Sequence, residues 1–231
     1  MPTLITHLME LTQLGSEIAG VLDLPQKYWP QPGQYLPCQR LDDDRHLLAT
    51  CLFRVLGDPD QISLAPIPEA WGPGDTLVFS PPQGRGFELP PSARRVGLIP
   101  MDVSPARLLA LVSPALGQGA EVSLFSDPAP PIDLLTRIPS QVEVLPQFSL
   151  MENPDWSDYL AVDLEWSALA SFIEQVDLRS LPGSGEVLVR TPMPCLGVGA
   201  CGVCTVHTRR GFRFTCVDGP VFPLKEVWHV A

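Results

Sequence analysis

The chain is organised around Thr191–Cys204, which reads TPMPCLGVGACGVC and is followed, after eleven further residues, by CVDGPVF at 216–222. Three cysteines fall within the first stretch, and a fourth begins the second. Thiolates are soft metal ligands, so four of them gathered in this way suit either a zinc ion or an iron–sulfur cluster.

The spacing of the four candidate ligands, Cys195, Cys201, Cys204 and Cys216, favours one of these metals. Structural zinc sites usually combine two short knuckles, one at each end of the site. The order here, C-x5-C-x2-C and one distant cysteine, is close to the plant-type [2Fe-2S] order of C-x4-C-x2-C…C. We therefore predict a [2Fe-2S] cluster, with zinc, disulfides or free thiols as the alternatives.

Three glycines, Gly197, Gly199 and Gly202, lie between the first three ligands. A residue without a Cβ allows φ > 0 and a close approach of the backbone to inorganic sulfide. Amides aimed at sulfur would stabilise the additional negative charge of a reduced cluster. A hairpin of residues 203–206 and 212–215 is expected to return Cys216 to the side of Cys204.

These motifs resemble the cluster-binding domain of the dihydroorotate dehydrogenase B electron-transfer subunit family, which has Met-Pro-Cys-Gly-x-Gly-x-Cys-x-x-Cys and Cys-x-Asp-Gly-Pro-Val-Phe. The match assigns Cys195, Cys201, Cys204 and Cys216 as the four ligands and Asp218–Phe222 as the closing stretch. This chain has one extra residue between the first two ligands. The resemblance implies a role in pyrimidine biosynthesis, with electrons passing to or from a flavoprotein catalytic subunit.

Length and composition exclude several other classes of protein. The chain has 231 residues, 27 prolines and a net charge of −11, and such an acidic body argues against binding nucleic acid. No apolar run is long enough for a membrane helix. The N-terminal residues lack the pattern of a signal peptide, so we expect a cytoplasmic protein in which clustered cysteines are ligands rather than disulfides.

Residues 1–92 are predicted to form a small closed β-barrel, because short apolar runs alternate with Pro and Gly turn signals. The predicted strands are 4–11, 17–24, 34–39, 47–55, 61–65 and 76–80. Pro32–Tyr35, Gly74–Leu77 and Gly84–Pro90 resemble the flavin-binding barrel of the ferredoxin reductase family.

Residues 93–190 are predicted to form a doubly wound α/β domain, which resembles the nucleotide-binding half of the same reductase family. We expect a helix that is capped by Ser104 and ends at Gly117, and a second helix over 164–176. The predicted strands are 95–99, 121–125, 142–145, 159–162 and 186–190. Residues 191–231 then form a small cluster-binding domain.

The flavin motif of that reductase family, Arg-Pro-x-Ser, is missing. The matching stretch, residues 48–53, contains Ala49-Thr50-Cys51 and offers a flavin diphosphate only one hydroxyl and its amides. Gly84 and Gly86 match the glycines near the flavin pyrophosphate and are the remaining candidates for binding FAD. The sequence favours loss of FAD over its retention.

The glycine-rich turn that binds NAD(P) in the same family is also missing. Residues 100–105 occupy its place, where Pro100 has no amide and Asp102 adds a negative charge beside the expected phosphate. Binding of NAD(P) is therefore not expected.

The other reactive side chains are predicted to be structural. Cys38 and Cys51 are interpreted as small buried residues of the barrel. We do not expect His207 or His229 to ligate the cluster. The arginines of the predicted hairpin suit either a solvated surface or contact with a redox partner; they are Arg209, Arg210 and Arg213. Two sets of carboxylates, Asp163 with Glu165 and the run Asp42–Asp44, are interpreted as solvated surface.

The leading functional hypothesis is an iron–sulfur electron-transfer subunit with no catalytic residue of its own. A complete reductase subunit containing both FAD and [2Fe-2S] is the second. A zinc-stabilised, non-redox assembly protein is the third.

Overall fold

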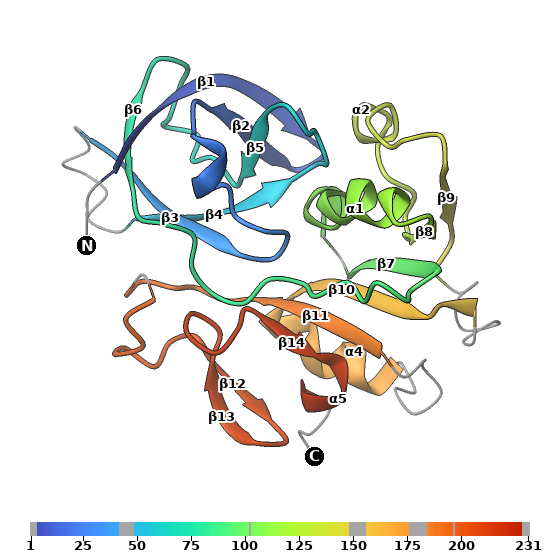
Figure 1. The fold of residues 1–231 in the computed structure, drawn as a ribbon. Helices are drawn as coiled ribbons and strands as arrows, with labels where there is room; N and C mark the ends of the chain where they lie inside the picture. The colour runs from blue at the N-terminus through green and yellow to red at the C-terminus, as the bar shows by residue number, and fades with distance from the viewer. Residues whose placement is uncertain are drawn as a thin grey trace.

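The computed structural model describes residues 4–41, 49–101, 103–147, 156–175, 184–195 and 197–227. Its strands form a closed barrel, a six-stranded sheet and a two-stranded hairpin (Figure 1). This confirms the predicted class of a β-barrel followed by an α/β domain. Several predicted features lie outside the described residues, namely the run Asp42–Asp44, the first two residues of the predicted strand 47–55, Asp102, the last residue of the predicted helix 164–176, and His229.

The barrel is closed by six antiparallel strands in the order β1-β2-β5-β4-β3-β6. Its interior is built from side chains that alternate along the strands and are fully buried, among them Leu36 of β3 and Leu52 of β4. Cys38 belongs to this interior, as predicted. The strands are β1 (Leu4–Leu14), β2 (Glu17–Leu22), β3 (Tyr35–Arg40), β4 (Thr50–Val55), β5 (Ile62–Ala65) and β6 (Thr76–Phe79).

The second sheet has the order β14-β11-β10-β7-β8-β9. The five predicted strands are parallel, but a sixth strand, β14, pairs antiparallel with β11. Because β14 follows Cys216, the cluster segment is built into the edge of this sheet. The strands are β7 (Arg95–Met101), β8 (Glu121–Phe125), β9 (Val142–Leu145), β10 (Tyr159–Glu165), β11 (Ser184–Arg190) and β14 (Val221–Pro223).

Short helices cover both faces of the sheet, with α1 and α4 on opposite sides (Figure 1). Ser104 caps η2 as predicted, since its Oγ accepts a hydrogen bond from the Ala106 amide at 3.3 Å. The helices are η1 (Gln26–Tyr28), η2 (Pro105–Leu111), α1 (Val112–Gly117), α2 (Ile132–Leu135), η4 (Trp166–Ala168), α4 (Leu169–Gln175) and α5 (Leu224–Val227). None of the described helices is long and apolar enough to span a membrane.

The prediction of a helix from residue 164 was wrong at its beginning. Strand β10 continues to Glu165, and the chain becomes helical only at Trp166. Residues 159–164 are all buried, as expected for a parallel strand that is covered on both faces.

One continuous core joins the barrel to the site. It contains Tyr35 and Phe53 of the barrel, the apolar side of η2, and the two cluster-segment cysteines Cys204 and Cys216. The barrel, the sheet and the cysteine loop are therefore packed against one another rather than linked only by the chain.

Candidate metal centre and the adjoining cavity

The cysteine loop begins directly after β11 and ends at a hairpin formed by β12 (Thr205–Thr208) and β13 (Gly211–Phe214). The three loop glycines have φ values of +88°, +71° and +71°, which confirms the expected left-handed backbone at Gly197, Gly199 and Gly202. A Cβ on Gly197 would collide with the side chains of Gln83 and Tyr35. The loop can approach the barrel only because glycine occupies this position.

The four cysteine sulfurs lie together as two neighbouring pairs. In the first pair, the Cys201 thiol hydrogen-bonds to the sulfur of Cys195. In the second, the sulfurs of Cys204 and Cys216 are 3.1 Å apart, as the predicted hairpin requires. A hydrogen bond between Cys216 and Cys195 joins the pairs. In the described ranges, no three His, Cys, Asp or Glu side chains are arranged as ligands of one ion.

The pKa values of two of these thiols are shifted in opposite directions by their surroundings. Burial raises the pKa of Cys195, but hydrogen bonds from the Cys201 thiol and from the amides of residues 199–201 outweigh burial and lower it to about 6. Burial, and then the neighbouring sulfurs of Cys204 and Cys195, raise the pKa of Cys216 to about 12. The loop amides thus point at the Cys195 sulfur and favour its thiolate form.

The barrel fixes the fourth cysteine through Tyr35. The Tyr35 hydroxyl donates a hydrogen bond to the Cys216 carbonyl at 2.8 Å. Burial, together with the nearby cysteine sulfurs, raises the pKa of Tyr35 above its usual value, so the hydroxyl keeps its proton. On the other side of Cys216, the carboxylate of Asp218 accepts from the Phe214 amide at 2.8 Å and closes the turn.

Gly84 and Gly86, the candidates for a residual flavin site, lie against protein atoms. A Cβ on Gly84 would be 2.6 Å from Pro220, and one on Gly86 would be 2.8 Å from the Pro32 carbonyl oxygen. The amide of Arg85 between them donates to the Gly219 carbonyl at 2.5 Å. These glycines therefore pack the barrel against the stretch that closes the cysteine loop.

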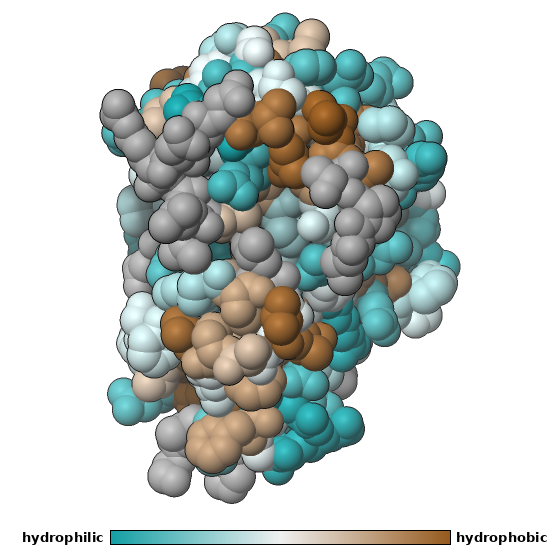
Figure 2. All heavy atoms as spheres, turned by 90° about the vertical axis from the view of Figure 1, so that its left-hand side faces the viewer, coloured by the Kyte–Doolittle hydropathy of each residue, from teal (hydrophilic) through white to brown (hydrophobic). Residues whose placement is uncertain are grey.

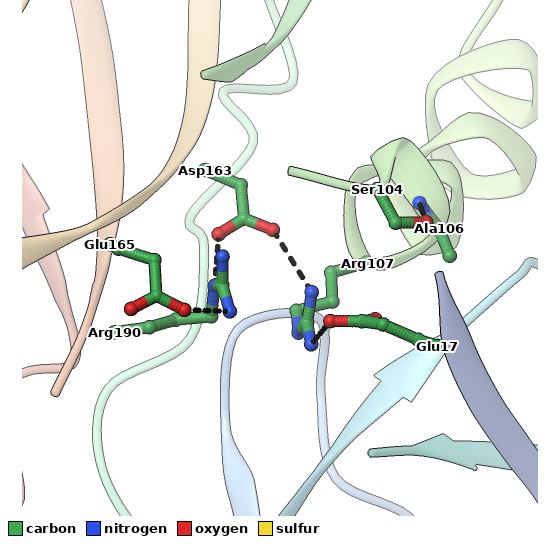
Figure 3. Close-up of polar contacts among 7 residues, drawn as sticks. All are labelled: Glu17, Ser104, Ala106, Arg107, Asp163, Glu165 and Arg190. Carbon is green, nitrogen blue, oxygen red and sulfur yellow. Dashed lines mark hydrogen bonds and ion pairs between the residues drawn. The ribbon is translucent and has the colours of Figure 1, made fainter. Parts of the chain in front are cut away.

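The carboxylates of Asp163 and Glu165 were predicted to be solvated, and for Asp163 this was wrong. Asp163 is fully buried in β10, where its Oδ1 accepts from Arg190 Nε at 2.8 Å. Its Oδ2 lies 3.5 Å from Arg107 Nη1, and Arg107 also pairs with Glu17 of the barrel at 2.5 Å (Figure 3). Glu165 is half-exposed and pairs with Arg190 at 3.0 Å.

This charged network borders a cavity of about 540 Å³, whose walls come from the barrel, η2 and the residues just before Cys195. Cys51 lines the same cavity and is only partly buried, unlike the interior residue expected at this position. Burial, and then the sulfurs of Cys195 and Cys204, raise the pKa of Cys51 to about 12. The cavity and the cysteine loop are therefore direct neighbours, which the sequence did not reveal.

A second cavity of about 380 Å³ lies at the ends of β7 and β8, beside the turn that replaces the glycine-rich sequence. Its lining includes the five prolines Pro100, Pro105, Pro128, Pro130 and Pro131. Proline has no amide hydrogen, so this lining offers few backbone donors to a phosphate.

The histidine and arginine side chains of the hairpin contact neighbouring residues of the same segment. His207 lies against Phe212, with ring centroids 5.1 Å apart. Arg210 pairs with Glu226 at 3.1 Å, and the guanidinium of Arg213 lies 3.7 Å from Asp218.

Exposed apolar side chains gather around the cysteine loop. We name Val198, Val203, Phe212 and Val217 the loop surface; each of these residues is more than half exposed. Figure 2 shows the left-hand face of Figure 1, with hydrophobic groups gathered over the barrel and again in the lower part of the molecule. Cys201 is exposed, so the cluster segment has one edge open to solvent.

The comparisons with known proteins agree with this geometry. Residues 191–228 match the family described as the iron–sulfur cluster binding domain of dihydroorotate dehydrogenase B. The chain is 26% identical over 235 residues to the dihydroorotate dehydrogenase B (NAD(+)) electron transfer subunit of Shouchella clausii (strain KSM-K16), covering 87% of this chain and 88% of that protein.

Solved structures show the same fold at low identity. The NADH-dependent reduced ferredoxin-NADP oxidoreductase has a TM-score of 0.71 and 17% identity, covering 96% of this chain and 90% of that one. A ferredoxin NADP+ reductase from Neisseria gonorrhoeae, with bound FAD and NADP, has a TM-score of 0.60 and 13% identity, covering 81% of this chain and 98% of that one.

Proposed function

We propose that this chain, which belongs to the family of dihydroorotate dehydrogenase B electron-transfer subunits, holds a [2Fe-2S] cluster on Cys195, Cys201, Cys204 and Cys216. The observation that carries the ligand assignment is the arrangement of the four sulfurs in two adjoining pairs. A two-iron cluster takes two thiolates on each iron, so Cys195 with Cys201 and Cys204 with Cys216 supply one pair each. A single zinc ion would instead draw all four sulfurs to one point.

The surroundings of the sulfurs suit such a cluster. A bound cluster supplies one-electron chemistry, with a potential that depends on hydrogen bonds, charge and exposure. The amides of residues 199–201 already donate to sulfur, and the left-handed glycines leave room for the backbone to come close. Tyr35 and Asp218 hold the segment around Cys216 in place.

The diphosphate of FAD finds little support in the described residues. The amides of Arg85 and Phe87 donate to the carbonyls of Gly219 and Pro32. The guanidinium of Arg85 is paired with the buried Glu186 at 2.9 Å. The donors of the loop that matches the pyrophosphate glycines are therefore already bonded within the protein and are not available to a diphosphate. We assign the electron transfer to the cluster.

The partner that suits this chain is a flavoprotein catalytic subunit. An electron carrier needs a surface on which its redox centre comes close to the next one, and the loop surface surrounds the exposed Cys201. Exposed apolar groups of this kind mark sites of protein association. Phe212 is the side chain of this surface most suited to act as an anchor, because aromatic residues dominate the energetics of interfaces.

The ligand assignment is tested by comparing Cys204→Ser with Cys51→Ser. Both thiols lie near Cys195, but only Cys204 belongs to a proposed ligand pair. We expect Cys204→Ser to lose the electron paramagnetic resonance signal of the reduced cluster and Cys51→Ser to keep it. A cluster of normal spectrum in Cys204→Ser would contradict the assignment.

The partner assignment is tested with Phe212→Asp and the matched control Ile132→Asp, since both side chains are 75% exposed. We expect Phe212→Asp to weaken association with a dihydroorotate dehydrogenase catalytic subunit by about tenfold or more, with the iron content unchanged. Equal affinities of the two variants would argue against the loop surface as the docking site.

A further inference from the structure

The Tyr35 hydroxyl of the barrel lies against both parts of the cysteine segment. Its oxygen is 2.8 Å from the Cys216 carbonyl oxygen, to which it donates, and 3.2 Å from Gln83 Oε1. A Cβ on Gly197, in the loop between the first two proposed ligands, would lie 2.6 Å from the same hydroxyl. One polar group therefore adjoins the loop that carries the first ligands and the residue that supplies the last one.

The barrel backbone determines where this hydroxyl lies. The Tyr35 amide donates to the Gln83 carbonyl at 3.1 Å, and the Gln83 amide donates to the Tyr35 carbonyl at 2.8 Å. The Tyr35 side chain is fully buried and lies tilted against Phe53, with ring centroids 6.2 Å apart. A dipole that is held in such a buried site acts more strongly on neighbouring charge than it would in water.

The cysteine sulfurs interact electrostatically with this hydroxyl. Burial, and then the sulfurs of Cys51, Cys216, Cys204 and Cys195, raise the pKa of Tyr35 above its ordinary value. Three of these four residues are proposed ligands. Because a Coulomb interaction acts equally on both partners, the phenol also influences the charge on those sulfurs.

The direction of this influence follows from the Cys216 carbonyl. Reduction adds one negative charge to an iron–sulfur cluster, and hydrogen bonds and nearby charge set the potential at which it occurs. The carbonyl oxygen carries partial negative charge beside a ligand, and the proton donated by Tyr35 compensates that charge. Without this donor the reduced cluster would lie beside an uncompensated carbonyl in a buried site. The hydrogen bond therefore favours the reduced state.

We infer that Tyr35 is a positioning residue that raises the reduction potential of the cluster through the Cys216 carbonyl, and that Gln83 competes for the same proton. This inference rests on the proposed function, because it requires a cluster on the four cysteines. The hydroxyl has one proton, and the shorter of its two contacts is the one to Cys216. A stronger acceptor at position 83 would draw the proton away from the carbonyl and lower the potential.

The test is a redox titration of the cluster-containing protein, followed through the electron paramagnetic resonance signal of the reduced cluster. We expect Tyr35→Phe to lower the equilibrium constant for reduction by about three- to tenfold, where tenfold corresponds to about 59 mV for a one-electron couple. Tyr28→Phe is the matched control, since Tyr28 packs against Phe79 in the separate core of the barrel. A purely structural role of Tyr35 would change stability and leave the potential at its wild-type value.

A second variant, Gln83→Glu, keeps Tyr35 in place and so separates the potential from any loss of folding. A carboxylate is a stronger acceptor than a carboxamide and adds negative charge beside the cysteine loop, so we expect the same equilibrium constant to fall by about tenfold or more. Gln61→Glu, at an exposed position just before β5, is the charge control and should change it by less than about twofold.

The outcomes separate this inference from the ligand assignment. A wild-type potential in Tyr35→Phe or in Gln83→Glu would overturn the inference and leave the assignment intact. A wild-type protein that holds no iron would overturn both. If Tyr35→Phe does not retain a cluster, the comparison of Gln83→Glu with Gln61→Glu decides.

Discussion

The Tyr35 hydroxyl donates a hydrogen bond to the Cys216 carbonyl across 181 positions of sequence, at a distance of 2.8 Å. This bond ties the barrel to the last cluster cysteine. We expect Tyr35→Phe to lower the free energy of unfolding by about 1–3 kcal/mol, because the carbonyl would stay buried without its donor. Urea denaturation measures this change. Tyr28→Phe is the control; unchanged stability in Tyr35→Phe would show that the bond is not formed.

Gly84 should be replaceable only at a large cost in stability. It has a φ of +76°, and a Cβ there would lie 2.6 Å from Pro220 and 2.7 Å from the Gly219 oxygen. We expect Gly84→Ala to lower the free energy of unfolding by about 1–3 kcal/mol. Gly72→Ala is the matched control, since no heavy atom lies within 4 Å of its Cβ position. Similar melting temperatures for the two variants would contradict the packing role of Gly84.

Asp163 should contribute more to stability than its neighbour Glu165. Asp163→Asn leaves two buried guanidiniums without their shared carboxylate, and breaking a buried pair costs about 3–5 kcal/mol. Glu165→Gln removes a half-exposed partner of Arg190, and we expect a loss of about 0–1 kcal/mol. Chemical denaturation of both variants separates these outcomes. An equal loss of unfolding free energy in the two variants would contradict the buried ion pairs of Asp163.

Asp158 should make stability depend on pH in the acidic range. Hydrogen bonds from the Arg94 amide, and then from the side chain of Arg95, hold the pKa of Asp158 below its ordinary value of 3.8. A carboxylate whose pKa is lowered by folding stabilises the protein above the unfolded pKa, and this contribution is lost as the pH falls through the folded pKa. We expect the stability difference between the wild type and Asp158→Asn to be present above about pH 5 and to shrink below about pH 4. A stability difference between the wild type and Asp158→Asn that does not change with pH would contradict this prediction.

Much of this fold could be predicted because its signals are local. Short apolar runs between Pro and Gly turn signals marked the barrel strands, and the predicted ranges 121–125 and 142–145 match β8 and β9. Two short strand-like runs on either side of residues 208–211 indicated the hairpin that brings Cys204 and Cys216 together.

The features that sequence analysis missed depend on contacts between distant residues. Asp163 was interpreted as surface, although it lies within the apolar run 159–164 that could have indicated a buried charge. Its partner Arg190 is 27 positions away, and nothing local links the two. The strand β14 was overlooked because its sequence was considered only as the end of the metal motif, whereas Val221 and Phe222 also complete the sheet. The cavity beside Cys51 exists only where the barrel, the sheet and the loop meet.

The measurement that tests the central proposal most directly is the quantity of iron, acid-labile sulfide, zinc and flavin in the anaerobically purified protein. We predict two irons and two sulfides per chain, bound through Cys195, Cys201, Cys204 and Cys216. One zinc ion per chain with no labile sulfide would contradict the proposal, because the four thiolates would then serve as a structural site.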